Sequence, residues 1–375
     1  MKIRATYLFL IVSVVALLSA CNVSKNLTDD EFLLHKNIIT HIDKSTRTAP
    51  LEDYLAQRPA PRFLGFFYSN IGIHYALKEK KSGFNKWLLR IFGAEPVFLD
   101  KFATVESANR MRAFLHNMSY FNSEIDIKYK YKKKKVAVEY IVKPKKPYLI
   151  NHFEWTSEDS ILLKKINQNS TESSILIGEK YNSYSLDNER ERVTEFLRSN
   201  GYYRFNKNFI NYKVDSSFSN QSLSILGEVK IPSAKINRKK AIGHQRYSVR
   251  DIYIYPNYNP LSVYDYKPDT LVVAVPSDLE DNRLDNYHFI YYNTLNIRPK
   301  VIAQSVFLGN NLLFNVDDLK KSYQKLNRFP IYKYVNISFT EDTSSMIGNT
   351  IPLDVSIRLS RAKTQSYTIE TDVTN

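Results

Sequence analysis

Side chains able to do chemistry are few in this sequence of 375 residues. It has one cysteine, Cys21, and seven histidines: His35, His41, His74, His116, His152, His244 and His288. No histidine pair has the HExxH spacing of a zinc site, and a single cysteine cannot build a multi-thiolate metal site. A GxSxG nucleophile elbow and a P-loop are also missing. The sequence therefore predicts no metal and no cofactor.

Glu189 and Glu191 are the candidate carboxylate pair for acid–base catalysis. One residue separates them, so in a helix their side chains point in different directions. Glu189 precedes Arg192 by three residues and Glu195 precedes Arg198 by three, which favours ion pairs along a solvated helix face. We therefore predict no catalytic residue and a protein that is not an enzyme.

Cys21 has a different explanation, which lies in the residues before it. Lys2 and Arg4 precede an apolar run over residues 7–20, which is shorter than the roughly 20 residues of a membrane-spanning helix. This pattern is typical of a signal peptide. Leu18-Ser19-Ala20-Cys21 resembles the lipobox of bacterial lipoproteins, which implies a signal peptide over residues 1–20 and acylation of Cys21. Several acyl chains would give a stable anchor. The alternative is an ordinary secretory signal that happens to contain a cysteine.

The formal net charge of +15 favours anionic partners, and the cell compartment decides which anionic partners the chain can meet. An exported chain does not meet the chromosome, so we expect anionic lipid headgroups or acidic partners and no nucleic acid. Residues 21–31 are polar and are predicted to form a tether. Their acidic cluster, Asp29-Asp30-Glu31, is either a solvated linker or a sorting signal.

The elements that must position these residues follow a pattern that occurs three times. The first copy has strands at 33–42, 124–131 and 136–142, with a helix capped by Thr104 whose apolar face includes Val105. In the second copy, strands at 148–155, 209–215 and 223–231 accompany a short helix at 160–167 and a longer one capped by Ser185. For the third copy we expect strands at 247–255, 301–308, 329–339 and 351–359 and a helix capped by Asn315.

This pattern predicts an α+β fold of three tandem domains. Their boundaries are placed at 32–147, 148–235 and 245–363. The first domain carries an aromatic-rich insertion at 59–100, and the third carries a polar insertion at 256–298.

The stretch Leu197–Asp215 contains the sharpest junction of the second copy. Gly201 is expected to end the helix in the left-handed conformation, which is unfavourable for residues that carry a side chain. Tyr202 and Tyr203 are expected to fix the helix to the sheet, with one ring inward and the other at the surface. Tyr120-Phe121 and Ile331-Tyr332 are the counterparts in the other copies, with Ser119 and Pro330 nearby in place of the glycine.

Several motifs of the chain resemble the POTRA domains of the BamA/TamA outer-membrane assembly family. The most specific match joins a helix and its turn and includes Glu189, Arg192, Gly201, Tyr202, Tyr203 and Phe205, which resemble the second POTRA domain of the TamL-type lipoproteins of that family. Gln57-Arg58-Pro59, residues 62–66, Trp87-Leu88 and residues 93–96 are also similar to that group.

The resemblance implies three POTRA-like βααββ domains that face the periplasm from the outer membrane. It implies unfolded outer-membrane protein clients, and a TamB-like periplasmic protein or a barrel subunit as partner. Residues 364–375 resemble the stretch that enters the first barrel strand, and no series of strands for a barrel follows. We expect either a fragment or a gene product that holds only the periplasmic part.

Exposed sheet edges are the expected functional surface, because an extended peptide can add a strand there. Lys128 and Lys130 would protect one such edge, or simply keep a hairpin soluble. The run Lys132, Lys133, Lys134, Lys135 is either a solvated turn or a contact with lipid headgroups. The aromatic insertion around Trp87 either packs on the first domain or meets a membrane or partner. The alternative function is a structural or ligand-binding lipoprotein, for example a glycan binder.

Overall fold

A computed structural model describes most of the chain between the predicted tether and the predicted barrel start. The described residues are 31–47, 49–60, 83, 87, 95–216, 220–232, 243–261, 266–276, 283–292, 295, 297–346 and 350–362. The predicted signal peptide, Cys21, most of the aromatic insertion and residues 364–375 lie outside them. In the part of the chain that is described, no helix is long and apolar enough to cross a membrane.

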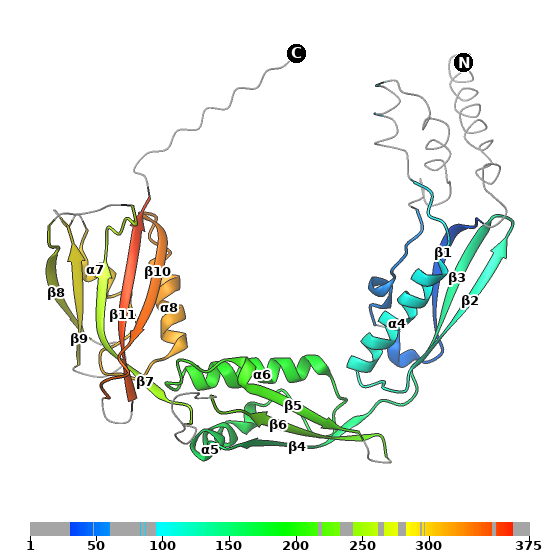
Figure 1. Ribbon diagram of the computed structural model, residues 1–375, viewed down its shortest axis with the longest axis horizontal. Coiled ribbons are helices and arrows are strands. Elements are labelled where there is room, and N and C mark those ends of the chain that lie inside the picture. The colour runs from blue at the N-terminus through cyan, green and yellow to red at the C-terminus, as the bar shows by residue number, and fades with distance from the viewer. Residues whose placement is uncertain are drawn as a thin grey trace, which may run out of the picture. The chain divides into compact units, whose positions relative to one another are not determined.

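The first repeat is a three-stranded sheet with one long helix on one face (Figure 1). Its elements are β1 (Leu33–His41), the 3-10 helices η2 (Lys44–Thr46) and η3 (Leu51–Tyr54), α4 (Lys101–Asn117), β2 (Glu124–Lys132) and β3 (Lys135–Lys143). The strand order is β1-β3-β2, with β1 parallel and β2 antiparallel to β3. Met111 and Leu115 of α4 are buried against Tyr140 and Val138 of β3.

The start of α4 corrects the sequence prediction. Asp100 caps the helix, because its Oδ1 accepts hydrogen bonds from the backbone N–H groups of Phe102 and Ala103. Thr104 is therefore inside the helix, where its hydroxyl bonds the hydroxyl of Tyr129. Val105 is 49% exposed and does not belong to the apolar face.

The second repeat has the same strand order with two helices on its sheet. It consists of β4 (Leu149–Ser157), α5 (Ser160–Gln168), η4 (Ser170–Glu172), α6 (Ser183–Arg198), η5 (Lys207–Phe209), β5 (Ile210–Asp215) and β6 (Ser222–Val229). The order is β4-β6-β5. Ser185 is not the cap of α6: the helix begins at Ser183, and the Asn182 side chain accepts from Tyr184 N–H.

The third repeat has a five-stranded sheet. Its elements are β7 (Arg246–Tyr255), β8 (Asp269–Pro276), β9 (Leu284–Tyr291), α7 (Pro299–Ala303), α8 (Val316–Leu326), β10 (Tyr332–Glu341) and β11 (Thr350–Arg361). The order is β10-β11-β7-β9-β8, so β7, β11 and β10 repeat the arrangement of the other two sheets. Asn315 caps α8 as expected, through a bond from Asp317 N–H to its Oδ1.

For the third repeat, one prediction is incomplete and one is wrong. The polar insertion at 256–298 also contains the antiparallel pair β8 and β9, which the sequence pattern did not predict. Residues 301–308 are not a strand: α7 begins at Pro299, a residue whose missing N–H costs nothing at the first helical position. The place beside β7 in the sheet is occupied by β9, which pairs with it in parallel from Ile252–Tyr287 to Ile254–Phe289.

Contacts along the backbone divide the chain into two compact bodies. The first holds Met1–Asn151, Gly178–Tyr184 and Ser216–Leu223. The second holds His152–Ile177, Ser185–Asp215 and Ser224–Asn375, which include most of the second repeat and the whole third repeat. The α+β class expected from the sequence is confirmed.

Candidate functional surfaces

Glu189 lies at the inner side of α6 and is fully buried. Arg192 donates two hydrogen bonds to the Glu189 carboxylate, at 2.9 Å from Nε to Oε2 and at 2.7 Å from Nη2 to Oε1. Oε2 also accepts from the backbone N–H of Ser174 at 2.8 Å. The expected ion pair is present, but the expectation that Glu189 is solvated is wrong. The pair holds the segment after η4 against α6, and the hydrogen bonds from Arg192 to Glu189 raise the pKa of the arginine.

The second expected pair, between Glu195 and Arg198, is not formed. Glu195 instead binds Lys320 of α8 through Oε1 and Nζ. The Arg198 guanidinium lies 6.0 Å from the ring centre of Phe314. Both side chains therefore contact the third repeat and not each other.

Gly201 ends α6 as the sequence predicts. Its φ of +96° is in the left-handed region, and the next N–H, that of Tyr202, bonds back to the Leu197 carbonyl at 3.2 Å. The Gly201 carbonyl then accepts from the backbone N–H of Tyr247 in β7 at 2.8 Å. A Cβ at Gly201 would also lie 3.3 Å from Cδ2 of Leu313. The turn is therefore the point at which the second repeat is attached to the third.

The two tyrosines after Gly201 serve different cores. Tyr202 is 2% exposed and packs with Phe205 in the core of the second repeat. Tyr203 inserts its ring among Tyr247, Phe314 and Phe339 of the third repeat, with centroid distances of 5.5, 5.0 and 5.2 Å. The prediction of an inward ring holds for Tyr202, whereas Tyr203 is half-buried by the next repeat.

A matching turn follows α4 in the first repeat. Ser119 has a φ of +76°, and its carbonyl accepts from the backbone N–H of Tyr148 at 3.0 Å. The next N–H, that of Tyr120, bonds to the Leu115 carbonyl at 2.9 Å. Phe121 packs against Tyr148 with a centroid distance of 5.0 Å. The chain therefore uses the same joint twice, once with glycine and once with serine.

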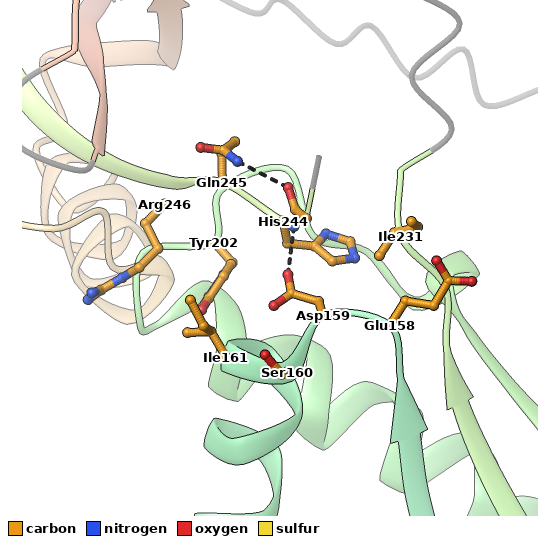
Figure 2. A pocket seen from close by; sticks show the side chains of 10 residues that line it. Glu158, Asp159, Ser160, Ile161, Tyr202, Ile231, His244, Gln245 and Arg246 are labelled. Atoms are coloured by element: carbon orange, nitrogen blue, oxygen red, sulfur yellow. Dashed lines mark hydrogen bonds between the residues drawn. The ribbon is translucent and has the colours of Figure 1, made fainter. Parts of the chain in front are cut away.

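A cavity of about 450 Å³ beside the Gly201 turn is lined by several titratable side chains (Figure 2). It is lined by Glu158, Asp159, Ser160, Ile161, Tyr202, Ile231, Gly243, His244, Gln245 and Arg246. Both carboxylate oxygens of Asp159 are used by the backbone. Oδ1 accepts from Leu162 N–H at 3.0 Å as the cap of α5, and Oδ2 accepts from His244 N–H at 2.8 Å.

The His244 ring does not complete a catalytic array with these groups. Its Nε2 lies 2.9 Å from the Lys230 carbonyl oxygen, and the ring packs against Phe205 and Phe209 at 4.9 and 4.7 Å. Burial lowers the pKa of His244 below its ordinary value of 6.5, which favours the neutral ring. Asp159 and His244 thus connect α5 to the start of β7, and their contacts are those of a structural joint.

Sheet edges are the other candidate surface. β2, an edge strand, carries Lys128 and Lys130, and the latter pairs with Glu139 of β3 at 2.8 Å. Lys133 and Lys134 form the turn between β2 and β3, and Lys132 and Lys135 are the strand ends beside it. Trp87 is 53% exposed. A contact of these lysines or of Trp87 with a membrane or partner stays a prediction.

The β8–β9 hairpin is the surface that sequence reasoning missed. Its signals were present: an uncharged, Val-rich run ends at Pro276, and a second run alternates from Leu284 to Tyr291. The sequence prediction described residues 256–298 as a polar insertion and named no strand within it.

Comparisons with known proteins give structural matches alone. No model of a known protein family and no curated protein matches the sequence. The chain is similar to BamA POTRA3-5 from Haemophilus influenzae, with a TM-score of 0.38 and 10% identity over 89% of this chain and 99% of that one.

Two further solved structures show the same range of similarity. BamA from Haemophilus ducreyi lacking POTRA domains 1-3 has a TM-score of 0.36 and 12% identity over 58% of this chain and 30% of that one. The N-terminal domain of Omp85 from Thermosynechococcus elongatus has a TM-score of 0.27 and 10% identity over 89% of this chain and 100% of that one.

Proposed function

We propose that this chain is a periplasmic array of three POTRA-like domains, anchored by acylated Cys21, that takes part in assembling outer-membrane proteins. The observation that carries the proposal is the recurrence of one sheet order. In each repeat the last strand lies between the first strand and the penultimate strand. The first strand pairs in parallel with the last strand or lies beside it. The motif that includes Gly201 and runs to Phe205, which resembles a POTRA domain, contains the turn that joins the second repeat to the third.

The proposed activity is the reception of client strands at open sheet edges. Edge strands offer backbone N–H and C=O groups to any extended segment, so binding tolerates many sequences. Such tolerance is what a protein that handles many unfolded outer-membrane clients requires. The partners are these clients and a TamB-like periplasmic protein or a barrel subunit, with no role for nucleic acid.

Photo-crosslinking in cells tests this function. A photoreactive residue replaces Tyr131 on the β2 edge, which is 49% exposed, or Tyr334 on the β10 edge, which is 62% exposed. Phe102 on α4, 79% exposed, is the matched control away from any edge. We expect outer-membrane barrel proteins or the TamB-like partner to crosslink to edge positions and not to position 102. Recovery of neither class at any edge would reject the proposal.

The anchor has a separate test. The substitution Cys21→Ser removes the thiol that acylation requires, so we expect the mature chain to move from the membrane fraction to the soluble periplasmic fraction. Cell fractionation and mass measurement of the N-terminal peptide check this. A Cys21→Ser chain that still pellets with membranes would show that another part of the protein is the main tether.

Glycan binding is a second candidate, because one observation favours it. The sheet face of the third repeat opposite its core carries Tyr253, Tyr255 and Arg358 on neighbouring strands. The guanidinium lies 5.9 Å from the Tyr255 ring centre and 5.4 Å from that of Tyr258. A cavity of about 170 Å³ adjoins these rings. Calorimetry with a panel of oligosaccharides tests this function, with Tyr258→Ala expected to abolish any binding seen.

A further inference from the structure

Strand β8 differs from every other edge strand that the structure describes. The edge strands are β1, β2, β4, β5, β8 and β10. All except β8 hold at least one charged or histidine residue between their terminal positions, such as Lys36, Lys128, Glu154, Lys213 and Lys333. In β8 the interior residues are Thr-Leu-Val-Val-Ala-Val. Natural proteins protect free edges with charges, so an uncharged edge requires an explanation.

The exposure of β8 shows that the edge is accessible. Val273 and Val275 contact the core of the third repeat, as inward residues of a strand should. Val272, on the opposite face, is 53% exposed, and Leu271 is 40% exposed. Alternate residues of an edge strand direct their backbone N–H and C=O groups away from their one neighbour, here β9. Among the described residues, β9 is the one strand that pairs with β8, so the edge combines main-chain groups that no other described strand pairs with and exposed apolar side chains.

The hairpin also changes which edge the third repeat presents. In the first two repeats the opening strand, β1 or β4, is itself an edge. In the third repeat β9 pairs with β7 and covers that position. The hairpin thus extends the sheet by two strands and places an uncharged strand at its limit.

We propose that β8 is a docking edge for an extended segment of another chain, which pairs with it as a sixth strand. The absence of charged side chains in the interior of β8 determines which partner segment matches it. The residues that flank the new strand on β8 are Thr270, Val272 and Ala274 on one face and Leu271, Val273 and Val275 on the other. A charged residue of the partner on the face of Val273 and Val275, which contact the core, would lose water there without gaining a counter-charge. The partner is therefore an uncharged segment with alternating β-branched and small polar residues.

This inference rests on the proposed function, because it assigns one edge to the reception of client strands. Its test uses the whole chain in detergent and a soluble probe, an acetylated peptide of four Thr-Val units followed by two lysines. Hydrogen–deuterium exchange of the β8 amides is measured with and without the peptide. At a peptide concentration ten times its Kd, we expect exchange in β8 to slow by about tenfold. Exchange in β10, the other edge of the sheet, should not change.

Two lysine substitutions form a matched pair. Ala274 and Asn286 face each other across β8 and β9, so a lysine at either position adds the same charge to the same exposed face. Ala274→Lys, on the edge, should remove the protection by the peptide, and Asn286→Lys, one strand inward, should retain it. Val272→Lys repeats the edge substitution and should also remove it.

Three results would overturn the inference. One is equal protection of β8 and β10, and another is equal loss of protection in Ala274→Lys and Asn286→Lys. The third is protection of β8 without peptide that grows with protein concentration, which would identify a second copy as the occupant. If crosslinks at Tyr131 or Tyr334 form in cells but the peptide does not protect the β8 amides, the proposed function stands and only the choice of edge is wrong.

Discussion

The buried carboxylate of Glu189 is paired with Arg192, so we expect stability to be sensitive to a change at this residue. Glu189→Gln removes the charge that Arg192 pairs with, and leaves the guanidinium without its hydrogen-bonded carboxylate in a site where its side chain is only 17% exposed. We expect the free energy of unfolding to fall by about 3 kcal/mol, the scale for breaking a buried ion pair. Urea unfolding measures it. Glu191→Gln, on the exposed side of α6, is the control and should change stability by less than about 0.5 kcal/mol. Equal effects would show that the pair adds nothing.

His244 predicts how stability depends on pH. Burial lowers its folded-state pKa below the ordinary 6.5, so the unfolded chain binds this proton more readily. Stability from His244 is therefore complete above pH 6.5 and is lost as pH falls toward the folded-state pKa. We expect His244→Gln to flatten the fall of the melting temperature on acidification. His152→Gln, at a side chain that is 54% exposed, should leave that fall unchanged. Parallel curves for the His244 variant and the parent would contradict this account.

At the scale of elements, the turns at Ser119 and Gly201 can be compared by giving each turn the residue type of the other. Ser119 adopts a left-handed φ that disfavours side chains, and its buried hydroxyl has no hydrogen-bond partner. Ser119→Gly should therefore raise stability by about 1 kcal/mol, and Gly201→Ser should lower it by at least that amount. Thermal unfolding of both variants checks the opposite signs. A loss of stability in both would mean that the Ser119 side chain makes a net contribution to its joint.

The sequence predicts elements well where one pattern decides them, and poorly where tertiary contacts decide. The alternating strands and the Gly201 turn follow from local periodicity and from the conformational freedom of glycine. The burial of Glu189 does not, because it depends on a segment after η4 folding back onto α6. Likewise residues 301–308 have a strand-like composition, but β9 takes the place beside β7. The left-handed conformation of Ser119 could not be predicted from the sequence, because it belongs to a turn whose carbonyl bonds the backbone N–H of the distant Tyr148.

At the scale of the whole molecule, we expect the contacts of Tyr203 to decide whether the second and third repeats unfold together. Most of the second repeat and the whole third repeat share one compact body, and Tyr203 lies within the aromatic cluster that connects them, beside the ion pair of Arg204 with Glu341 at 2.6 Å. We expect both repeats to exchange their protected amides in one cooperative step. Tyr203→Ala should split this step in two, because it removes ring contacts that belong to neither repeat alone. Tyr202→Ala should instead lower the stability of the second repeat while the step remains shared, since that ring is buried in the repeat's own core. A single step in Tyr203→Ala would show that the polar contacts suffice to couple the repeats.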